Sequence, residues 1–203
     1  MNQPWLSIIL PTVGRPGLER ALRSITCQPA MGIEILVVED TLSGTQPHVK
    51  VLAAQYGALY VGHAGAEHCW GHPQRNAGME AATGRWLAWM ADDDIYTQLS
   101  VDAIARQVVR QEASGDPCPL LFRVKMNQYR TLVWGAPGHI MIGNVDAECI
   151  VTPNDPARLG RWAMEYTGDF DFIRDTVESF GRCRWVEDVI AIARPTDHED
   201  WTR

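Results

Sequence analysis

Short apolar runs alternate along the first half of the chain with segments whose apolar residues recur at helical spacing. Apolar runs that are bounded by turn residues and too short for a helix predict buried strands, here Trp5–Leu10, Gly32–Val38, Ala58–Val61 and Arg85–Ala91. The segments between them predict helices, which begin at Pro16, cover Val49–Tyr56, and run from Pro73 to Gly84. This alternation predicts an α/β fold.

Strands that alternate with helices join through right-handed crossovers, and they form a mostly parallel central sheet with helices on both faces. Such sheets bind ligands beyond the carboxyl ends of their strands. Polar segments follow three of the predicted strands, namely Thr12–Arg15, Glu39–Asp40 and Asp92–Asp94. Solvated loops are the alternative interpretation, but polar groups at three strand ends favour a shared functional rim.

The second half of the chain is less regular. Its patterns predict helices over Ser100–Gln111 and Gly168–Phe180. They predict strands over Leu120–Met126, Thr131–Trp134, Gly138–Val145 and Trp185–Ala193. The first two of these strands are expected to pair antiparallel around the Asn127–Gln128 turn. Because no linker separates the halves, we expect one domain over 1–203 with a small mixed C-terminal part.

Composition narrows the class of protein. The formal charge is −7 over 203 residues, which argues against a broad nucleic-acid-binding surface. No apolar run reaches the roughly 20 residues that cross a bilayer, and the start MNQPWLSIIL has no secretory signal pattern. The five cysteines are scattered and odd in number, as in proteins of a reducing compartment. We therefore expect a cytoplasmic protein.

The stretch WMADDDIY, Trp89–Tyr96, places three adjacent carboxylates after an apolar run. Adjacent like charges repel unless water, a cation or a hydrogen-bond donor relieves them. Mg²⁺ and Mn²⁺ prefer oxygen ligands and complete their shells with water and substrate phosphates. Asp92, Asp93 and Asp94 are therefore candidates for a metal site, with a solvated loop as the alternative.

The surrounding segment QRNAGMEAATGRWLAWMADDDIY, Gln74–Tyr96, resembles the inverting family 2 glycosyltransferases of the GT-A fold. That family carries an R-N-x-G…A-x-G segment, an apolar strand and an acidic DxD-type motif. The opening strand with Pro11 and the VVED at Val37–Asp40 match the same pattern in order, and the ADDDIY form is most similar to spore-coat polysaccharide transferases. The motif's usual first aspartate is Ala91 here. The resemblance implies a nucleotide-sugar-binding half at 1–98 and an acceptor and catalytic half at 99–203.

The resemblance implies a nucleoside-diphosphate-sugar donor, with a UDP-sugar favoured, and Mn²⁺ or Mg²⁺ as cofactor. The positions implied to bind the donor are Pro11, Thr12, Arg15, Glu39, Asp40, Arg75, Asn76 and Asp92. Among them, Asp40 would accept from the base, and Arg75 would reach the base or the diphosphate. Asn76 would help hold its loop, and Asp92 would face the ribose or the metal. The implied metal ligands are Asp93, then Asp94, with His198 as a C-terminal addition.

An inverting transfer needs a general base that deprotonates the acceptor hydroxyl. The family supplies a carboxylate near the start of a late helix, often within an E-D pair. In TGDFDFIRD, Asp169 matches that position, while Gly168 replaces the acidic partner. Asp169 is the predicted base and Asp171 the second choice. Capping of the helix is the alternative role of Asp169, and the two roles are compatible.

Other residues are weaker candidates. Arg194 is placed to neutralise a diphosphate, and Trp162 and Trp201 are candidates for stacking on a sugar ring, although tryptophans usually lie in the core. The loop HAGAEHCWGH, 63–72, holds histidines and a cysteine that zinc accepts, but its spacing matches no standard zinc site.

Two other functions fit part of the pattern. A nucleotidyltransferase shares the Rossmann-like half and an acidic metal site, but PTVGRPGLER lacks the Gly-rich basic loop of that class. A GT-A module that binds a nucleotide or glycan without turnover is compatible with Ala91 and Gly168. The acceptor stays open between a glycan, a protein and a modified nucleobase.

Overall fold

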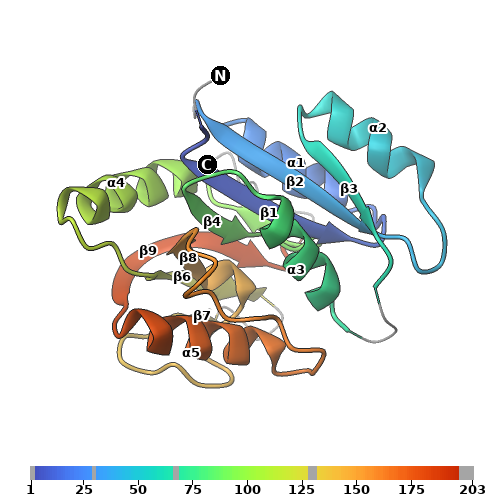
Figure 1. Cartoon of the computed structure of the whole chain (residues 1–203). Coiled ribbons are helices and arrows are strands. Elements are labelled where there is room, and N and C mark those ends of the chain that lie inside the picture. Colours follow the sequence, from blue (N-terminus) through green and yellow to red (C-terminus); the bar gives the residue numbers. More distant parts are fainter. Residues whose placement is uncertain (1–2, 29–30, 66–68, 128–131, 197–203) are drawn as a thin grey trace.

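The computed structural model describes residues 3–28, 31–65, 69–127 and 132–196 (Figure 1). Its first half contains four strands that pair in parallel in the order β3-β2-β1-β4. Their bounds are β1 Leu6–Thr12, β2 Ile33–Asp40, β3 Leu59–His63 and β4 Trp86–Trp89. The predicted order of strands and helices in this half is confirmed.

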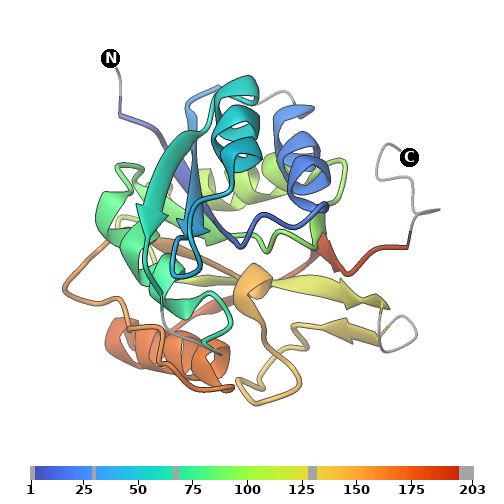
Figure 2. The ribbon, with the colours of Figure 1, turned by 90° about the vertical axis from the view of Figure 1, so that its right-hand side faces the viewer.

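Helices cover both faces of the sheet, as predicted. They are α1 Leu18–Thr26, α2 Pro47–Gln55, α3 His72–Ala81, α4 Ser100–Ala113 and α5 Gly168–Phe180. Successive residues of a strand point to opposite faces of its sheet, so β1 contributes to two cores. Its residues Leu6, Ile8 and Leu10 pack in the core with α1, α2 and α4. Ile9 instead packs in the core beneath α3 and α5. Figures 1 and 2 show how these two helices lie along the sheet.

The same sheet continues through the second half of the chain in the order β4-β8-β6-β9-β5, with β7 paired to β6. These strands are β5 Ile95–Tyr96, β6 Leu120–Met126, β7 Leu132–Trp134, β8 Ile150–Pro153 and β9 Arg184–Ala193. The predicted antiparallel pairing of β6 with β7 is confirmed. The fold is therefore α/β, with a parallel first half and a mixed second half.

The strand predicted over Gly138–Val145 is wrong. This segment is a loop in which the Asn144 side chain donates to the carbonyl of Ala136 at 3.0 Å and accepts from its N–H. The strand of this region is β8, which follows a short 3₁₀ turn, η2, Ala147–Cys149. β5 was not predicted, since two residues are too short to give a pattern.

The antiparallel pairing of β4 with β8 decides what the second half adds to the rim. Ala88 pairs with Val151 and Trp86 with Pro153, so the start of β8 lies beside the end of β4. Residues just before β8 therefore meet residues just after β4.

None of the helices in the described ranges is long and apolar enough to cross a membrane.

Candidate active site

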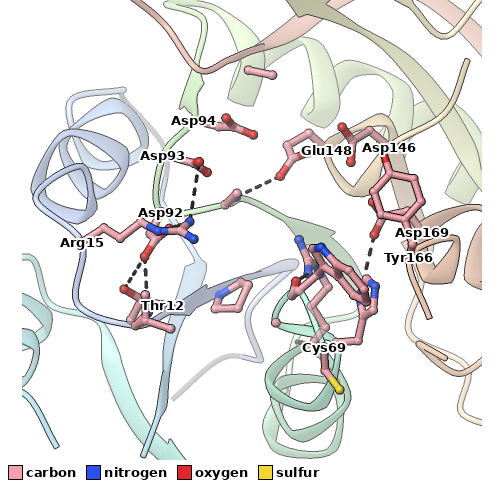
Figure 3. Close-up of a pocket in the computed structure, with 18 of the residues that line it drawn as sticks. Thr12, Arg15, Cys69, Asp92, Asp93, Asp94, Asp146, Glu148, Tyr166 and Asp169 are labelled. Atoms are coloured by element: carbon pink, nitrogen blue, oxygen red, sulfur yellow. Dashed lines mark hydrogen bonds and ion pairs between the residues drawn. The ribbon is translucent and has the colours of Figure 1, made fainter. Parts of the chain in front are cut away.

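A cavity of about 940 Å³ opens at the carboxyl ends of β1, β2 and β4. Its lining includes residues predicted from all three strand ends, namely Pro11, Thr12, Arg15, Asp40, Asp92, Asp93 and Asp94. Arg75, Asp169 and Arg194 also line it. Figure 3 shows the aspartates after β4 on one side of the cavity and Asp169 on the other. The structure thus brings the three predicted strand ends to a single cavity.

Asp92 ties the first loop to the end of β4. Its Oδ2 accepts from the Thr12 hydroxyl at 2.7 Å, and its Oδ1 lies 3.0 Å from the Arg15 guanidinium. Gly17 makes this close approach possible, because a Cβ at that position would collide with the Asp92 carbonyl oxygen. Since both carboxylate oxygens have partners in the loop, Asp92 holds the loop in place. Its direct contact with a ribose or a metal stays a prediction.

Asp93 and Asp94 differ in their surroundings. The Asp93 side chain is 36% exposed, and its Oδ2 lies 3.6 Å from Arg15 and 3.7 Å from Arg194. Asp94 is buried, and its Oδ1 accepts the Arg194 N–H at 2.8 Å. Burial raises the pKa of Asp94 to about 7, and the charges of Asp93 and Asp146 act in the same direction, while the Arg194 N–H opposes them. Asp93 therefore presents its charge to the cavity, while Asp94 supports the wall.

Two acids that the sequence did not single out complete the opposite wall. Asp146 and Glu148 lie at η2, just before β8, and reach the end of β4 because the two strands are antiparallel. Glu148 is buried and accepts the N–H of Ala91 at 2.9 Å. Thus a carboxylate does meet position 91, although it comes from elsewhere in the chain. An acidic pair directly before the apolar run Cys149–Val151 was the available signal.

The acids of this wall crowd one another. Burial raises the pKa of Asp146 to about 7, with the nearby Asp169 adding to the increase. Burial also raises the pKa of Glu148 well above its ordinary value, and Asp146 and Asp94 reinforce the shift. The Arg75 guanidinium opposes both shifts. Crowded carboxylates of this kind are typical of a site that takes up a proton or a cation.

α3 brings Arg75 and His72 to the floor of the cavity. Arg75 is only 6% exposed, donates to the Trp70 carbonyl at 2.7 Å, and lies over the Trp162 ring. The His72 ring also stacks on Trp162, with the two ring centroids 5.7 Å apart. Trp162 is itself 2% exposed and stacks on Phe172. The suggestion that Trp162 stacks on a sugar is therefore wrong, because the ring is core.

Two of the predicted donor-binding residues do not line the cavity. Glu39 is fully buried and accepts from the Gln46 N–H and the Tyr60 hydroxyl, so it braces the loop after β2. Asn76 exchanges hydrogen bonds with the backbone of Trp162, at 3.0 and 3.1 Å, and so holds a loop, as the resemblance implied. The polar atoms of both side chains are already engaged inside the protein.

Asp171, the second choice as base, does not line the cavity either. It accepts from the Thr167 hydroxyl at 3.0 Å and pairs with Arg174 at 2.9 Å. Asp169 does line the cavity and is 29% exposed. It lies in the first turn of α5, whose N-cap is Thr167, so Asp169 is not the cap residue.

His198 and Trp201 lie outside the described residues, as does His68 of the loop considered for zinc. Over the described ranges, histidine, cysteine and acidic side chains form no group of three or more arranged for a metal ion. A hard divalent cation needs only one or two carboxylates when substrate phosphates complete its shell. Asp93, with its exposed oxygen, and Asp94 beside it fit such a substrate-completed site.

Comparison with known proteins agrees with this geometry. The model of glycosyl transferase family 2 matches residues 7–133, which is more than half of the chain. The chain belongs to glycosyl transferase family 2. The Bacillus subtilis (strain 168) protein YwdF, described as an uncharacterized glycosyltransferase, is 33% identical over 105 residues, which cover 51% of this chain and 38% of YwdF. Family membership favours sugar transfer over the nucleotidyltransferase alternative.

Solved structures resemble the whole described fold. S. aureus TarS 1–349 in complex with UDP-GlcNAc has a TM-score of 0.69 at 14% identity, over 97% of this chain and 60% of TarS 1–349. The mannosyltransferase PcManGT from Pyrobaculum calidifontis, in complex with GDP-Man and Mn²⁺, has a TM-score of 0.64 at 16% identity, over 97% of this chain and 59% of PcManGT. These likenesses confirm the GT-A fold. The chain spans less than two thirds of the length of each of these relatives.

Proposed function

We propose that this protein transfers a sugar, with inversion, from a nucleoside-diphosphate-sugar to an acceptor hydroxyl, using a divalent cation. The observation that carries the proposal is the cavity in which Asp93 and Arg15 face Asp169 across one space. An inverting transfer needs a leaving-group site and a base on opposite sides of the anomeric carbon. Membership of family 2 supports the reaction class.

The donor is assigned to the half of the cavity built by 1–98. Pro11, Thr12, Arg15, Asp40 and Arg75 line this part. Asp40 is partly exposed, and its Oδ1 already accepts from the N–H of Leu42 and of Gly65, so its Oδ2 is the oxygen offered to a base. A UDP-sugar is the favoured donor, in line with the UDP and UDP-GlcNAc complexes of TarS.

Asp93 and Asp94 would hold Mn²⁺ or Mg²⁺ together with the donor phosphates. When bound, such an ion neutralises the charge that develops on the leaving diphosphate. Arg15 and Arg194 flank Asp93 within 4 Å and add fixed positive charge at the same place. Arg194 adopts a left-handed backbone, φ 47°, which is uncommon for a residue with a side chain and is found preferentially at functional sites.

Asp169, in the half built by 99–203, is assigned as the general base. Its carboxylate takes the proton of the acceptor hydroxyl while that oxygen forms a bond to the anomeric carbon. The bond from the anomeric carbon to the diphosphate oxygen breaks, and its electron pair leaves with the diphosphate. A proton transfer of this kind contributes about 10²- to 10⁴-fold to the rate.

The acceptor is assigned to the cavity mouth beside Asp169. Trp70 and Tyr166 line the mouth, are 54% and 72% exposed, and meet edge to face with ring centroids 5.7 Å apart. Exposed aromatic faces suit sugar rings and other flat or apolar acceptor surfaces.

Calorimetry with UDP and GDP, with and without Mn²⁺, tests the donor site. We expect nucleotide binding that strengthens with the metal, and absence of any metal-dependent binding would overturn the proposal. Product analysis by NMR tests inversion once a donor is found. Asp169→Asn should lower turnover by about 10²-fold or more while nucleotide affinity is unchanged.

A further inference from the structure

His72 is a buried side chain that the proposed transfer does not yet use. It is 1% exposed, it lines the cavity, and neither ring nitrogen makes a hydrogen bond of ordinary geometry in the described structure, although the Glu165 carbonyl lies near the ring. A buried polar group without a partner is unfavourable, so its presence calls for an explanation. The residues nearest to the ring suggest one.

The nearest charged oxygen belongs to Asp169. Nδ1 of His72 lies 3.9 Å from Oδ1 of Asp169, and that oxygen is also buried and without a hydrogen-bond partner among the described residues. The two unpaired atoms therefore face each other at slightly more than hydrogen-bonding distance, a contact drawn beside Asp169 in Figure 3. Catalytic hydrogen bonds are often long in ligand-free structures and tighten when substrate binds.

Gly168 explains how the ring comes so close. A Cβ at this position would lie 2.6 Å from Nε2 of His72 and 2.5 Å from the carbonyl oxygen of Ala163. Any side chain at 168, an acidic one included, would displace the imidazole. The glycine that stands directly before Asp169 is thus the residue that admits His72.

The ring is uncharged at neutral pH. Burial lowers the pKa of His72 to about 4, and the Arg75 charge contributes, while the backbone carbonyl of Glu165 opposes the decrease. A neutral imidazole donates through one nitrogen only, so it can orient a carboxylate without forming an ion pair with it.

We propose that His72 is a positioning residue for Asp169, donating from Nδ1 to Oδ1 and so fixing the orientation of the carboxylate that meets the acceptor hydroxyl. The inference rests on the proposed function, since Asp169 is the base of that transfer. His72 orients the base as a neutral donor. An acidic partner at position 168 would instead place a second negative charge next to Asp169. A neutral donor suits a wall where Asp146 already faces Asp169.

Two amide variants test this with a matched control. The side-chain nitrogen of His72→Asn falls near the position of Nδ1, while that of His72→Gln falls near Nε2. Both variants lose the ring stacking on Trp162. We expect His72→Gln to lower kcat by about 10- to 100-fold, the value of a hydrogen bond to a charged group, with the donor Kd unchanged. His72→Asn should retain kcat within about threefold.

The pH profile gives a second measurement. A donor at Oδ1 stabilises the ionised carboxylate, so the acid limb of kcat/KM should move to higher pH in His72→Gln and not in His72→Asn. Asp146 and Arg75 also face this region, and both are the same in the two variants. Equal kcat and equal profiles in the two variants would overturn the inference.

Two further measurements separate the inference from the proposed function and from misfolding. If Asp169→Asn keeps full activity, the base assignment itself fails. If Asp169→Asn is inactive but the two His72 variants are equal, only the role of His72 fails. Should either His72 variant not fold, nitrogen NMR of the wild-type imidazole with donor bound decides. Hydrogen on Nδ1 is expected, and hydrogen on Nε2 alone would overturn the inference.

Discussion

The two walls of the cavity accommodate negative charge in opposite ways. On the wall assigned to the donor, which the residues after β1, β2 and β4 form and which is called the donor wall, Asp92 and Asp93 lie within 4 Å of arginine side chains. Asp92 also accepts a hydroxyl hydrogen bond. On the other wall, Glu148 is buried and Asp146 is half-buried beside it, and the Arg75 guanidinium only partly offsets their raised pKa. Acids paired with arginines and hydrogen-bond donors hold the backbone in place, whereas crowded acids repel one another and retain protons. The comparison predicts that removing an acid from the two walls changes the free energy of unfolding in opposite directions.

The largest effect is expected from Asp92→Ala on the donor wall. The substitution leaves the Thr12 hydroxyl and the Arg15 guanidinium without their acceptor. We expect the free energy of unfolding to fall by about 2 kcal/mol. Chemical denaturation measures it, with Glu178→Ala at an exposed position as control. A loss no larger than that of the control would contradict the anchoring role of Asp92.

Asp93→Ala is expected to act on ligand binding instead of stability. Asp93 is partly exposed, and its ion pairs in the described structure are with the tips of two arginines at 3.6 and 3.7 Å, so the free energy of unfolding should change little. The Mn²⁺-dependent part of nucleotide affinity should fall by about tenfold, because a carboxylate ligand is lost. Calorimetry with and without the metal separates this part. An unchanged metal dependence in Asp93→Ala would remove Asp93 from the metal site.

Glu148→Gln on the crowded wall should stabilise the protein at high pH. The raised pKa of Glu148, Asp146 and Asp94 means that the folded state keeps protons that the unfolded state releases near pH 4. Their contribution to stability is therefore present at low pH and is lost as pH rises towards and beyond 7. Gln removes one repelling group while its amide oxygen still accepts from Ala91.

Denaturation at pH 5 and pH 8 measures the difference between the variant and the wild type. The variant should gain about 1 kcal/mol relative to the wild type over this interval. The lowered pKa of His72 changes stability with pH in the opposite direction. This contribution is common to both proteins and cancels in the difference. If the stability advantage of Glu148→Gln over the wild type shrank as the pH rises, the acids of this wall would not be crowded.

The smallest effect is expected from Tyr166→Ala at the mouth. Tyr166 is 72% exposed and meets Trp70 edge to face. Its removal should raise the acceptor KM by a few fold, about 1 kcal/mol or less, with the donor KM unchanged. Tyr166→Phe is the control for the ring without its hydroxyl. A donor KM that rises instead would assign this aromatic pair to the donor.

The donor wall could be predicted because its residues follow parallel strands, whose carboxyl ends meet at the same edge. Thr12, Asp40 and Asp92 reach the rim for that reason. Neighbouring residues on a strand point to opposite faces. The sequence therefore could not predict that Glu39 is buried while Asp40 lines the cavity. Only the packing of Tyr60 and Gln46 reveals which of the two points inward.

The opposite wall could be predicted only in part. Asp169 was found through the family pattern, but Asp146 and Glu148 depend on an antiparallel strand whose position the sequence did not reveal. The same uncertainty led to the incorrect strand over Gly138–Val145. Trp162 and His72 make a long-range contact between α3 and the segment before α5, and local patterns carry no sign of it.

Asn76 joins these two segments through both atoms of its amide, one donating to and one accepting from the Trp162 backbone. A backbone N–H held in this way exchanges with solvent only when α3 and the chain preceding α5 separate. The hydrogen-exchange rate of the Trp162 amide therefore measures how often that separation occurs. It reports how frequently the segment that leads into α5, the helix of Asp169, detaches from the helix that carries His72 and Arg75.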